Sequence, residues 1–511
     1  MERYRILPTA PLERPYASGA SVRTVLRNGA GESDEPRIRK GTLPVPGKFR
    51  ERTELPAELA TIPPLPPIAI QPFLHAAYVS QWNPLGRKDL DIHAKQLDLA
   101  FPDLFFWDGA ADGCTVTESA NWNVGRILRE NGIFTMPRFS DRSVPGAAVG
   151  FAELIRNPKM GECLAGELKR ATLNRSAPGI AIDIGKIGVR DRETYVDWLL
   201  GLTRLFHTAG LYVSVSVPVG NEAFDYGSIG QIADFVLIDV TDDSAVQPDS
   251  AQIPPGSFFE ESLATLFKAV PPSKSIVILE THGYDRNLNT GTRPEKIAFG
   301  TAVSIAGNAG VGVRWDAASQ AAGFAYLGID GKEHRVDFPD ASSIWNRYLA
   351  ARRLGARGVS LSRIGDEDPT VWQFYSGGLF ESFDPRSLGQ LPGSGDIVEY
   401  GNGKMYRIRS LASSGERILS FSGRTVVAEE YARLPKNLSV ERFAPGKPKT
   451  VVLTFHGGPD AVVGDRILEF LRNRGIRSTF FPAADAVASY SGTLHRILAD
   501  GHLVGNHASW T

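Results

Sequence analysis

The sequence contains little cysteine and little methionine: its 511 residues include two cysteines, Cys114 and Cys163, and four methionines. So few cysteines exclude a disulfide framework and any cysteine-rich zinc module. Free cysteine is among the most buried residue types, so Cys114 and Cys163 are predicted to be two unpaired core residues. Cysteine content alone does not fix the compartment in which the chain works.

An excess of charge and a long apolar run are also missing. The chain has 56 basic and 57 acidic residues, a formal net charge of −1, and no basic stripe with interleaved aromatic residues. Phosphate binding needs clustered lysine and arginine, so no nucleic-acid partner is expected. No run of about 18 apolar residues is present, which predicts no transmembrane segment. The polar opening stretch MERYRILPTAPLERPYAS lacks the apolar core of a signal peptide.

Composition divides the chain into four regions, of which three are short. Residues 1–65 are rich in Arg, Pro, Gly and Glu without periodicity, which predicts a disordered or extended proline-rich tail. Residues 380–447 hold many turn residues between short alternating strands, which predicts a small β-rich connector. Residues 448–511 begin with a strand, a helix and a second strand, so they are predicted to open another βαβ unit.

The large region, residues 66–379, alternates apolar strands with amphipathic helices. Strands that are apolar along their whole length indicate a parallel sheet buried on both faces. About eight strand–helix units indicate a (β/α)8 TIM-like barrel, so the fold class is predicted to be α/β. There is one candidate strand too many, so at least one belongs to an extra hairpin or is no strand. The candidates lie at residues 73–82, 104–109, 133–140, 179–185, 211–219, 233–240, 275–283, 311–316 and 358–365.

Two histidines stand at the ends of predicted strands in the last region. The strand VVLTF is followed by His456, and the stretch GHLVGNH ends at His507. Catalytic groups of α/β barrels lie at the carboxyl ends of strands, and two histidines there could hold a metal ion or relay a proton. The alternative is that each histidine caps a loop or is half-buried.

The last region contains the motifs TFHGGP, STFF and GHLVGNH in this order. In order and spacing they resemble the polysaccharide deacetylase family, of the chitooligosaccharide-deacetylase type. The resemblance implies a hydrolase of C–N bonds, in which an Asp base and a zinc-like divalent metal activate water against an N-acetyl group. The matching residues are Thr454, Phe455, Gly458, Pro459, Ser478, Thr479, Phe480, Phe481, Gly501, His502, Gly505, Asn506 and His507.

Departures from that family decide the expected activity. His456 stands at the position of the Asp base, Gly457 replaces the metal-binding Asp, and Thr511 replaces one of two metal-binding histidines. His507 is the remaining metal ligand that the resemblance implies, and one imidazole cannot hold a zinc-like ion. Residues 448–511 match only the N-terminal part of the family domain, so it is predicted to be truncated. The alternative is a rewritten site in which His456 is the base or a ligand.

The large region contains YVSQWNP, GIAIDIGKI, ADFVLIDVTDD, SIVILETHGYD and GARGVSLSRIGDEDPTVW in this order. These stretches resemble chitinase-type barrels of glycoside hydrolase family 18, in the degenerate form that precedes a deacetylase domain in bacterial multidomain proteins. In active members a glutamate protonates the glycosidic oxygen and the substrate's N-acetyl group attacks. The resemblance implies Asp183 as a catalytic-strand carboxylate, but the glutamate is replaced by Gly185. The alternative is that Asp183 is a buried carboxylate satisfied by its neighbours.

Aromatic and acidic residues near the predicted strand ends of the barrel are candidates for sugar binding. Rings that stack on sugar faces and carboxylates that accept hydroxyl hydrogen bonds would form a glycan-binding cleft. For each tryptophan, packing in the core is the alternative. The candidates are Trp82, Trp107, Asp239, Asp242 and Trp315.

The sequence therefore predicts a carbohydrate-active protein of the polysaccharide deacetylase family. It is expected to be catalytically impaired and to act in glycan binding or polysaccharide modification, with a polysaccharide or chitooligosaccharide of the N-acetylglucosamine type as ligand. One alternative is an active metal-dependent de-N-acetylase that uses His456 and His507, and another is a non-functional truncated product. The resemblance suggests the cell envelope or export, although the sequence shows no export signal.

Overall fold

The computed structural model describes most of the chain from residue 62 onward, and its parts fall into two compact units. Among the described residues, one unit extends to Ile397 and includes Ser410–Leu438, and the other comprises Val398–Arg409 and the residues from Ser439. The predicted tail, residues 1–65, lies outside the described residues except for its last four. The described residues are 62–66, 68, 71–80, 83–107, 113–119, 123–141, 150–240, 253–290, 293–328, 331–393, 397–401, 403, 405–443, 451–457, 463–483, 487 and 491–505.

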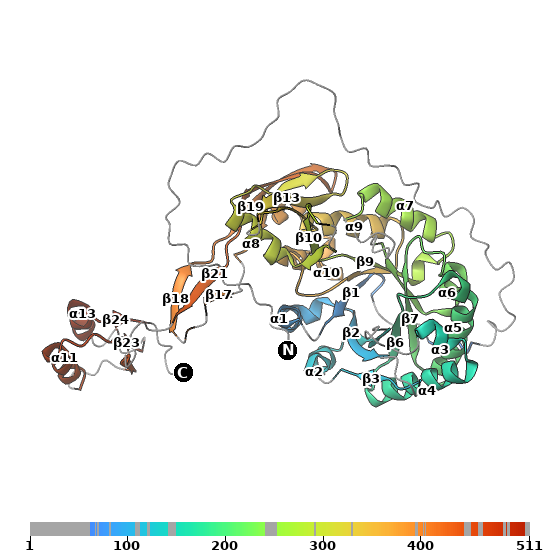
Figure 1. The fold of residues 1–511 in the computed structure, drawn as a ribbon, viewed down its shortest axis with the longest axis horizontal. Helices are drawn as coiled ribbons and strands as arrows, with labels where there is room; N and C mark the ends of the chain where they lie inside the picture. Colours follow the sequence, from blue (N-terminus) through green and yellow to red (C-terminus); the bar gives the residue numbers. More distant parts are fainter. Residues whose placement is uncertain are drawn as a thin grey trace, which may run out of the picture. The chain divides into compact units, whose positions relative to one another are not determined.

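The larger unit is built on a closed barrel of parallel strands (Figure 1). The barrel closes because the first strand pairs in parallel with both the second and the last. The predicted (β/α)8 TIM-like barrel is therefore confirmed. In barrel order the eight strands are β1 (Leu74–Val79), β2 (Leu99–Phe106), β5 (Arg138–Ser140), β6 (Gly179–Asp183), β7 (Tyr212–Pro218), β8 (Phe235–Asp239), β9 (Ser275–Leu279) and β15 (Gly358–Leu361).

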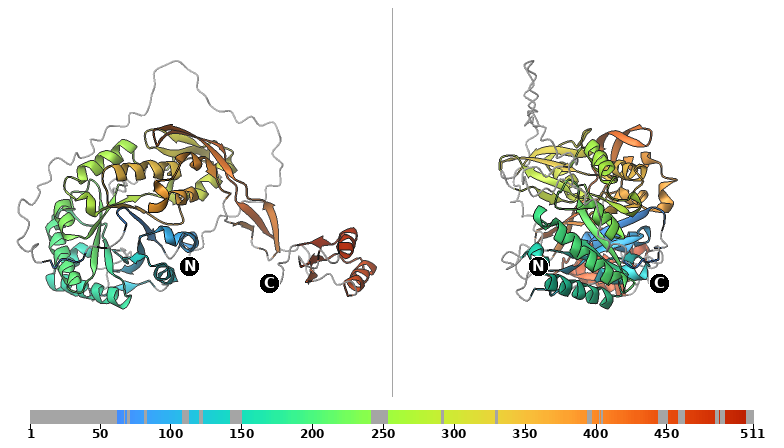
Figure 2. Two further views of the ribbon diagram at one scale, coloured as in Figure 1. Left: turned by 180° about the vertical axis from the view of Figure 1, so that it is seen from behind. Right: turned by 90° about the vertical axis from the view of Figure 1, so that its right-hand side faces the viewer.

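The helices that follow these strands cover the outside of the barrel, as α3, α4 and α5 do beside β6 and β7 (Figure 2). Their starts follow from local sequence: Asn157 caps α4 ahead of Pro158, and Asp340 and Ser343 form a capping box on α9. The helices are α1 (Pro84–His93), α2 (Asn123–Glu130), α3 (Phe151–Ile155), α4 (Pro158–Asn174), α5 (Arg192–His207), α6 (Tyr226–Ile232), α7 (Gly256–Leu266), α9 (Ala341–Arg353) and α10 (Gly377–Phe380).

A second, mainly antiparallel sheet accounts for the surplus candidate strand. Residues 311–316 contribute β12, which pairs antiparallel with β13 and β20 and is not a barrel strand. Helix α8 (Phe299–Ala309) packs on this sheet. In spatial order its strands are β11 (Glu295–Ile297), β10 (Gly283–Asn287), β14 (Glu333–Phe338), β13 (Ala321–Leu327), β12 (Arg314–Asp316), β20 (Thr425–Arg433), β19 (Gly415–Ser422) and β16 (Gln390–Leu391).

Residues 380–447, predicted as a β-rich connector, supply strands to two different sheets. Strands β16, β19 and β20 complete the second sheet of the barrel unit. Three further strands form a separate sheet in the order β17-β21-β18, namely β17 (Ile397–Gly401), β21 (Leu438–Phe443) and β18 (Met405–Ser410). Residues 410–438 therefore belong to the same compact unit as the barrel.

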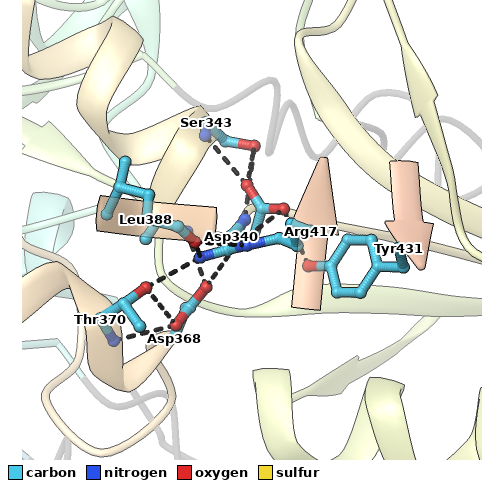
Figure 3. Close-up of polar contacts among 8 residues, drawn as sticks. Asp340, Ser343, Asp368, Thr370, Leu388, Arg417 and Tyr431 are labelled. Atoms are coloured by element: carbon cyan, nitrogen blue, oxygen red, sulfur yellow. Dashed lines mark hydrogen bonds and ion pairs between the residues drawn. The ribbon is translucent and has the colours of Figure 1, made fainter. Parts of the chain in front are cut away.

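A buried ion-pair network joins β19 to the barrel (Figure 3). The guanidinium of Arg417 donates to Asp368 Oδ2 at 2.7 Å and to Thr370 Oγ1 at 3.0 Å, and it lies 3.4 Å from Asp340 Oδ2. Tyr431 of β20 donates to the same Asp340 oxygen at 2.9 Å. Because Asp340 caps α9 and Asp368 follows β15, one arginine ties three parts of the unit together.

The expectation of two unpaired core cysteines is wrong, because Cys114 and Cys163 form a disulfide. Their Cα atoms are 5.8 Å apart, although they are separated by 49 positions in the sequence. Cys114 follows β2, and Cys163 lies on the exposed side of α4. The fold therefore brings two distant segments side by side, which cysteine content and spacing do not reveal.

The C-terminal segment forms a small parallel sheet with two helices. Its strands run in the order β22 (Thr454–His456), β23 (Thr479–Phe481) and β24 (Leu503–Val504). Helices α11 (Val463–Asn473) and α13 (Ser491–Ala499) pack through a small core of Leu468, Leu471, Phe480 and Ile497. This is the strand–helix–strand alternation that the sequence predicts. No helix in the described parts of the chain is both long and apolar enough to cross a membrane.

Candidate functional site

Charged side chains of three neighbouring barrel strands, β2, β5 and β6, gather near the end of β6. Arg138, the first residue of β5, lies 2.7 Å from Asp103 Oδ1 and 3.3 Å from Asp183 Oδ2. Burial disfavours the charged guanidinium, but the charges of Asp103 and Asp183 raise the pKa of Arg138 above its ordinary value. Asp183 is therefore held by an arginine from the neighbouring strand, and it stays partly exposed at the carboxyl end of β6.

Asp141 lies beside the position that the family acid would occupy. It follows β5 directly, and its Oδ1 accepts a hydrogen bond from the backbone nitrogen of Gly185 at 3.3 Å. Burial raises the pKa of Asp141 to about 6, because the hydrogen bond from Gly185 only partly offsets the loss of solvation and Asp183 adds a like charge. The two carboxyl groups thus have different surroundings, since Asp183 has an arginine partner and Asp141 accepts a backbone hydrogen bond.

Two tyrosines complete this end of the barrel. The hydroxyl of Tyr78 lies 3.0 Å from Ser216 Oγ, and the guanidinium of Arg138 lies 5.0 Å from the centre of the Tyr78 ring. The hydroxyl of Tyr195, a fully buried residue near the start of α5, has no hydrogen-bond partner among the described residues. Burial and the nearby charge of Asp183 raise the pKa values of both tyrosines, so both hydroxyls stay protonated and able to donate.

A further carboxylate lies just beyond the end of β9. Glu280 is almost fully buried and accepts a hydrogen bond from the hydroxyl of Tyr284 at 2.6 Å, and His282 Nε2 lies 2.9 Å from the same oxygen. Burial opposes ionisation, but His282 and the hydrogen bonds hold the pKa of Glu280 below its ordinary value. Its other carboxylate oxygen has no hydrogen-bond partner in the described part of the chain. We read Glu280 as part of the scaffold around the barrel end.

The structure describes three of the five predicted sugar-binding residues and places them in different surroundings. Asp239 ends β8, and its charge acts on Tyr78, so it belongs to the same barrel end as Asp183. Trp107 lies in the core, with its indole N–H donating to Gly113 O at 3.1 Å. Trp315 belongs to β12 of the second sheet rather than to a barrel strand. Trp82 and Asp242 lie outside the described residues.

The C-terminal segment places His456 at the carboxyl end of β22, as predicted. Its ring is exposed and stacks on Phe481, with 4.7 Å between the ring centres. Gly457 has φ 90°, a left-handed conformation that suits glycine, and its backbone N–H donates to Phe481 O. Gly457 supplies no side-chain oxygen, so the position of the family's metal-binding Asp offers no ligand.

The residues of this segment that the structure describes do not fit a catalytic metal ion. Within the described ranges, no group of three His, Cys, Asp or Glu residues could hold one. His507 and Thr511 lie outside those ranges. His502 is buried, and its Nδ1 lies 3.2 Å from the backbone nitrogen of Ser478, so it joins β23 to β24.

Sequence reasoning missed Arg138, Asp141 and Glu280. Two of them carry a recognisable signal, because a charged residue directly follows an apolar strand: Asp141 comes after IFTMPRFS, and Glu280 comes after SIVIL. Such residues lie at the carboxyl edge of a parallel barrel, where the catalytic groups of this architecture are found. Arg138 gives no comparable signal, since its pairing with Asp103 and Asp183 depends on strand register.

Comparison with known proteins gives a family match for the C-terminal segment. Residues 444–511 match the family model described as Polysaccharide deacetylase. The peptidoglycan-N-acetylglucosamine deacetylase PgdA of Listeria monocytogenes is 35% identical over 78 residues, which cover 15% of this chain and 16% of that protein. The chain therefore carries a polysaccharide deacetylase segment at its C-terminal end.

The barrel has relatives of a different kind. The cortical fragment-lytic enzyme of Bacillus subtilis is 26% identical over 209 residues, which are 39% of this chain and 48% of that protein. The chain thus spans about half the length of this curated relative. A chitinase structure from Chromobacterium violaceum superposes with a TM-score of 0.54 at 20% identity, over 60% of this chain and 99% of the other. The fold is that of a chitinase-like barrel.

Proposed function

We propose that the chain acts in the recognition and modification of a polysaccharide rich in N-acetylglucosamine, and that its barrel holds the glycan. The observation that carries the proposal is the set of polar groups at one end of the barrel. Asp141 follows β5, Asp183 ends the neighbouring strand β6 and Asp239 ends β8, with Arg138 and Tyr78 beside Asp183. Carboxylates and hydroxyls at the carboxyl ends of barrel strands are suited to bind sugar hydroxyl and acetamido groups.

The names of the relatives support the same class of ligand. One is named as an enzyme lytic for cortical fragments, and another as a deacetylase of peptidoglycan N-acetylglucosamine. The second name states the sugar, N-acetylglucosamine. We therefore take an oligosaccharide of this sugar as the probe.

In this proposal the C-terminal segment is impaired in deacetylation. Gly457 gives no oxygen ligand, and His456 replaces the carboxylate base of the family. A metal-dependent attack on an amide needs both a held metal ion and a base. In this proposal the barrel therefore carries the glycan-binding function, and the deacetylase segment is an attached module.

Titration calorimetry of the full chain with a chitin hexasaccharide tests this proposal. Arg138→Gln should weaken binding about tenfold or more, because it releases Asp183 and Asp103 from their shared partner. Arg286→Gln is the matched control: Arg286 is similarly buried and pairs with Asp337 on the second sheet. Absence of binding by the wild-type chain, or equal effects of the two substitutions, would contradict the proposal.

A further inference from the structure

We propose that the barrel is a glycoside hydrolase in which Asp141, from the neighbouring strand, is the general acid in place of the residue missing at Gly185. This inference rests on the proposed function, because it requires the glycan to bind at the same barrel end. It extends that function from binding to cleavage of the glycosidic bond.

The register of the strands brings Asp141 to this position. Ser140, the last residue of β5, pairs with Asp183, the last residue of β6, so Asp141 emerges beside the turn that contains Gly185. Its Oδ1 lies 3.3 Å from the Gly185 nitrogen, which places the carboxyl group next to the backbone that would have carried the acid. A carboxyl group from the adjacent strand therefore lies beside the Gly185 backbone.

Space for a ligand remains beside this carboxyl group. An ideal Cβ placed on Gly185 would have no described heavy atom within 4 Å, other than those of its chain neighbours. The Cβ position of the missing acid is therefore open. The fully buried hydroxyl of Tyr195, which has no hydrogen-bond partner in the described structure, lies within electrostatic reach of both Asp141 and Asp183. Because this hydroxyl has no solvent-exposed area, a sugar at the open position is expected to contact the carboxyl groups rather than Tyr195.

The surroundings of Asp141 suit a proton donor. Burial raises the pKa of Asp141 to about 6, so a large part of this group is protonated in mildly acidic solution. The charged and titratable groups that act on it or on its neighbour are Asp183 of β6, Lys186 after β6, Arg138 of β5 and Tyr195 of α5. Asp183 differs because it forms an ion pair with Arg138. Two carboxyl groups in unlike surroundings are the usual arrangement for glycoside hydrolysis.

The reaction balances without any further reactant besides water. Asp141 gives its proton to the glycosidic oxygen as the bond from that oxygen to C1 breaks, and the leaving sugar departs as an alcohol. The carbonyl oxygen of the substrate's own acetamido group forms a bond to C1, which gives a cyclic oxazolinium ion. Water then adds to C1 and passes a proton to the Asp141 carboxylate, which restores the acetamido group and the acid.

Hydrolysis of chitin hexasaccharide by the full chain, followed by mass spectrometry of the products, tests the inference. Asp141→Asn keeps an acceptor for the Gly185 nitrogen but has no proton to give, so the rate should fall about 100-fold or more. Binding measured by calorimetry should weaken much less than the rate, because the asparagine amide oxygen still accepts a hydrogen bond from a sugar hydroxyl group. Asp197→Asn, an exposed position on α5, is the control and should keep the wild-type rate.

A rescue variant separates chemistry from folding. Gly185→Glu added to Asp141→Asn should restore activity. The Cβ position at residue 185 is open, and the family to which the barrel is similar has its catalytic glutamate at this position. The wild-type rate should decline above a pH of about 6 as Asp141 loses its proton. The rate of the rescued variant should decline at a different pH, because its acid is the added glutamate. Wild-type activity in Asp141→Asn would overturn the inference. Binding without any cleavage would overturn it and leave the proposed function intact, whereas absence of binding would overturn both.

Discussion

Arg417 and Asp368 form an ion pair with no exposed side-chain area: Nη1 of the arginine donates to Oδ2 of the aspartate at 2.7 Å. The two residues lie 49 positions apart, on β19 and just after β15. Removing one partner of such a pair leaves the other charge buried without compensation. The resulting loss of stability is larger than the stability that the intact pair contributes. The strands of residues 410–438 are thus integral to the barrel unit.

Arg417→Met is expected to lower the free energy of unfolding by about 3–5 kcal/mol, because Asp368 and Asp340 would remain buried without their cation. Denaturant unfolding followed by circular dichroism measures the change. Arg433→Met on the same hairpin is the control, since Arg433 pairs with Glu416 in an exposed position and should contribute less than about 1 kcal/mol. Equal losses in the two variants would contradict the structural role of Arg417.

Glu367 makes the stability of the barrel depend on pH. It is buried after β15 and accepts hydrogen bonds from the Gly365 nitrogen at 2.6 Å and the Trp372 indole at 2.9 Å. Burial raises the pKa of Glu367 to about 8, whereas in the unfolded chain it ionises near its ordinary value. The folded state then holds a proton that the unfolded state has lost, so stability falls as the pH rises toward 8.

Between pH 6 and pH 9, the unfolding free energy of the wild type should therefore fall relative to that of Glu367→Gln. The expected change is about 3 kcal/mol, because glutamine has no proton to lose. At pH 6 the Glu367→Gln variant should be less stable than the wild type. Its side-chain amide nitrogen is itself a donor and would face the N–H group of Gly365 or of the Trp372 indole. Glu261→Gln, at an exposed position on α7, provides the control. Parallel pH profiles of wild type and Glu367→Gln would show that Glu367 does not hold the extra proton.

The disulfide between Cys114 and Cys163 should stabilise the protein by about 2–4 kcal/mol, because it closes a loop between segments 49 residues apart. Protein produced in an oxidising compartment should react with iodoacetamide only after reduction, when both cysteines become labelled. Cys163→Ser should unfold at lower denaturant concentration than the oxidised wild type. Labelling of both thiols before reduction would disprove the bond.

The zinc content of the protein tests the proposal that the C-terminal segment is impaired in metal-dependent deacetylation. After dialysis against zinc and then buffer, elemental analysis should find well below one zinc ion per chain, and His456→Ala should not change that content. Gly457→Asp alone should not create a site, because a non-glycine residue at φ 90° is strained. Stoichiometric zinc that disappears in His456→Ala would instead support an active site rewritten around His456 and His507.

The sequence predicts the barrel well, because local apolar patterns determine where its strands and helices form. Asp183 and Asp239 were found as strand-end carboxylates for the same reason. Contacts between distant segments were not predictable: the pairing of Cys114 with Cys163 and the reach of Asp141 to Gly185 depend on how strands and helices are placed side by side. The role of residues 410–438 was missed for this reason also, since β20 pairs with β12 across a long stretch of sequence.

The most direct test of the account is a crystal structure of the full chain grown with saturating chitin hexasaccharide. We predict an N-acetylglucosamine residue at the carboxyl ends of β5 and β6, with sugar oxygens within hydrogen-bond distance of Asp141 and Asp183. Sugar bound elsewhere on the chain, or no bound sugar at a concentration that saturates binding in solution, would contradict it.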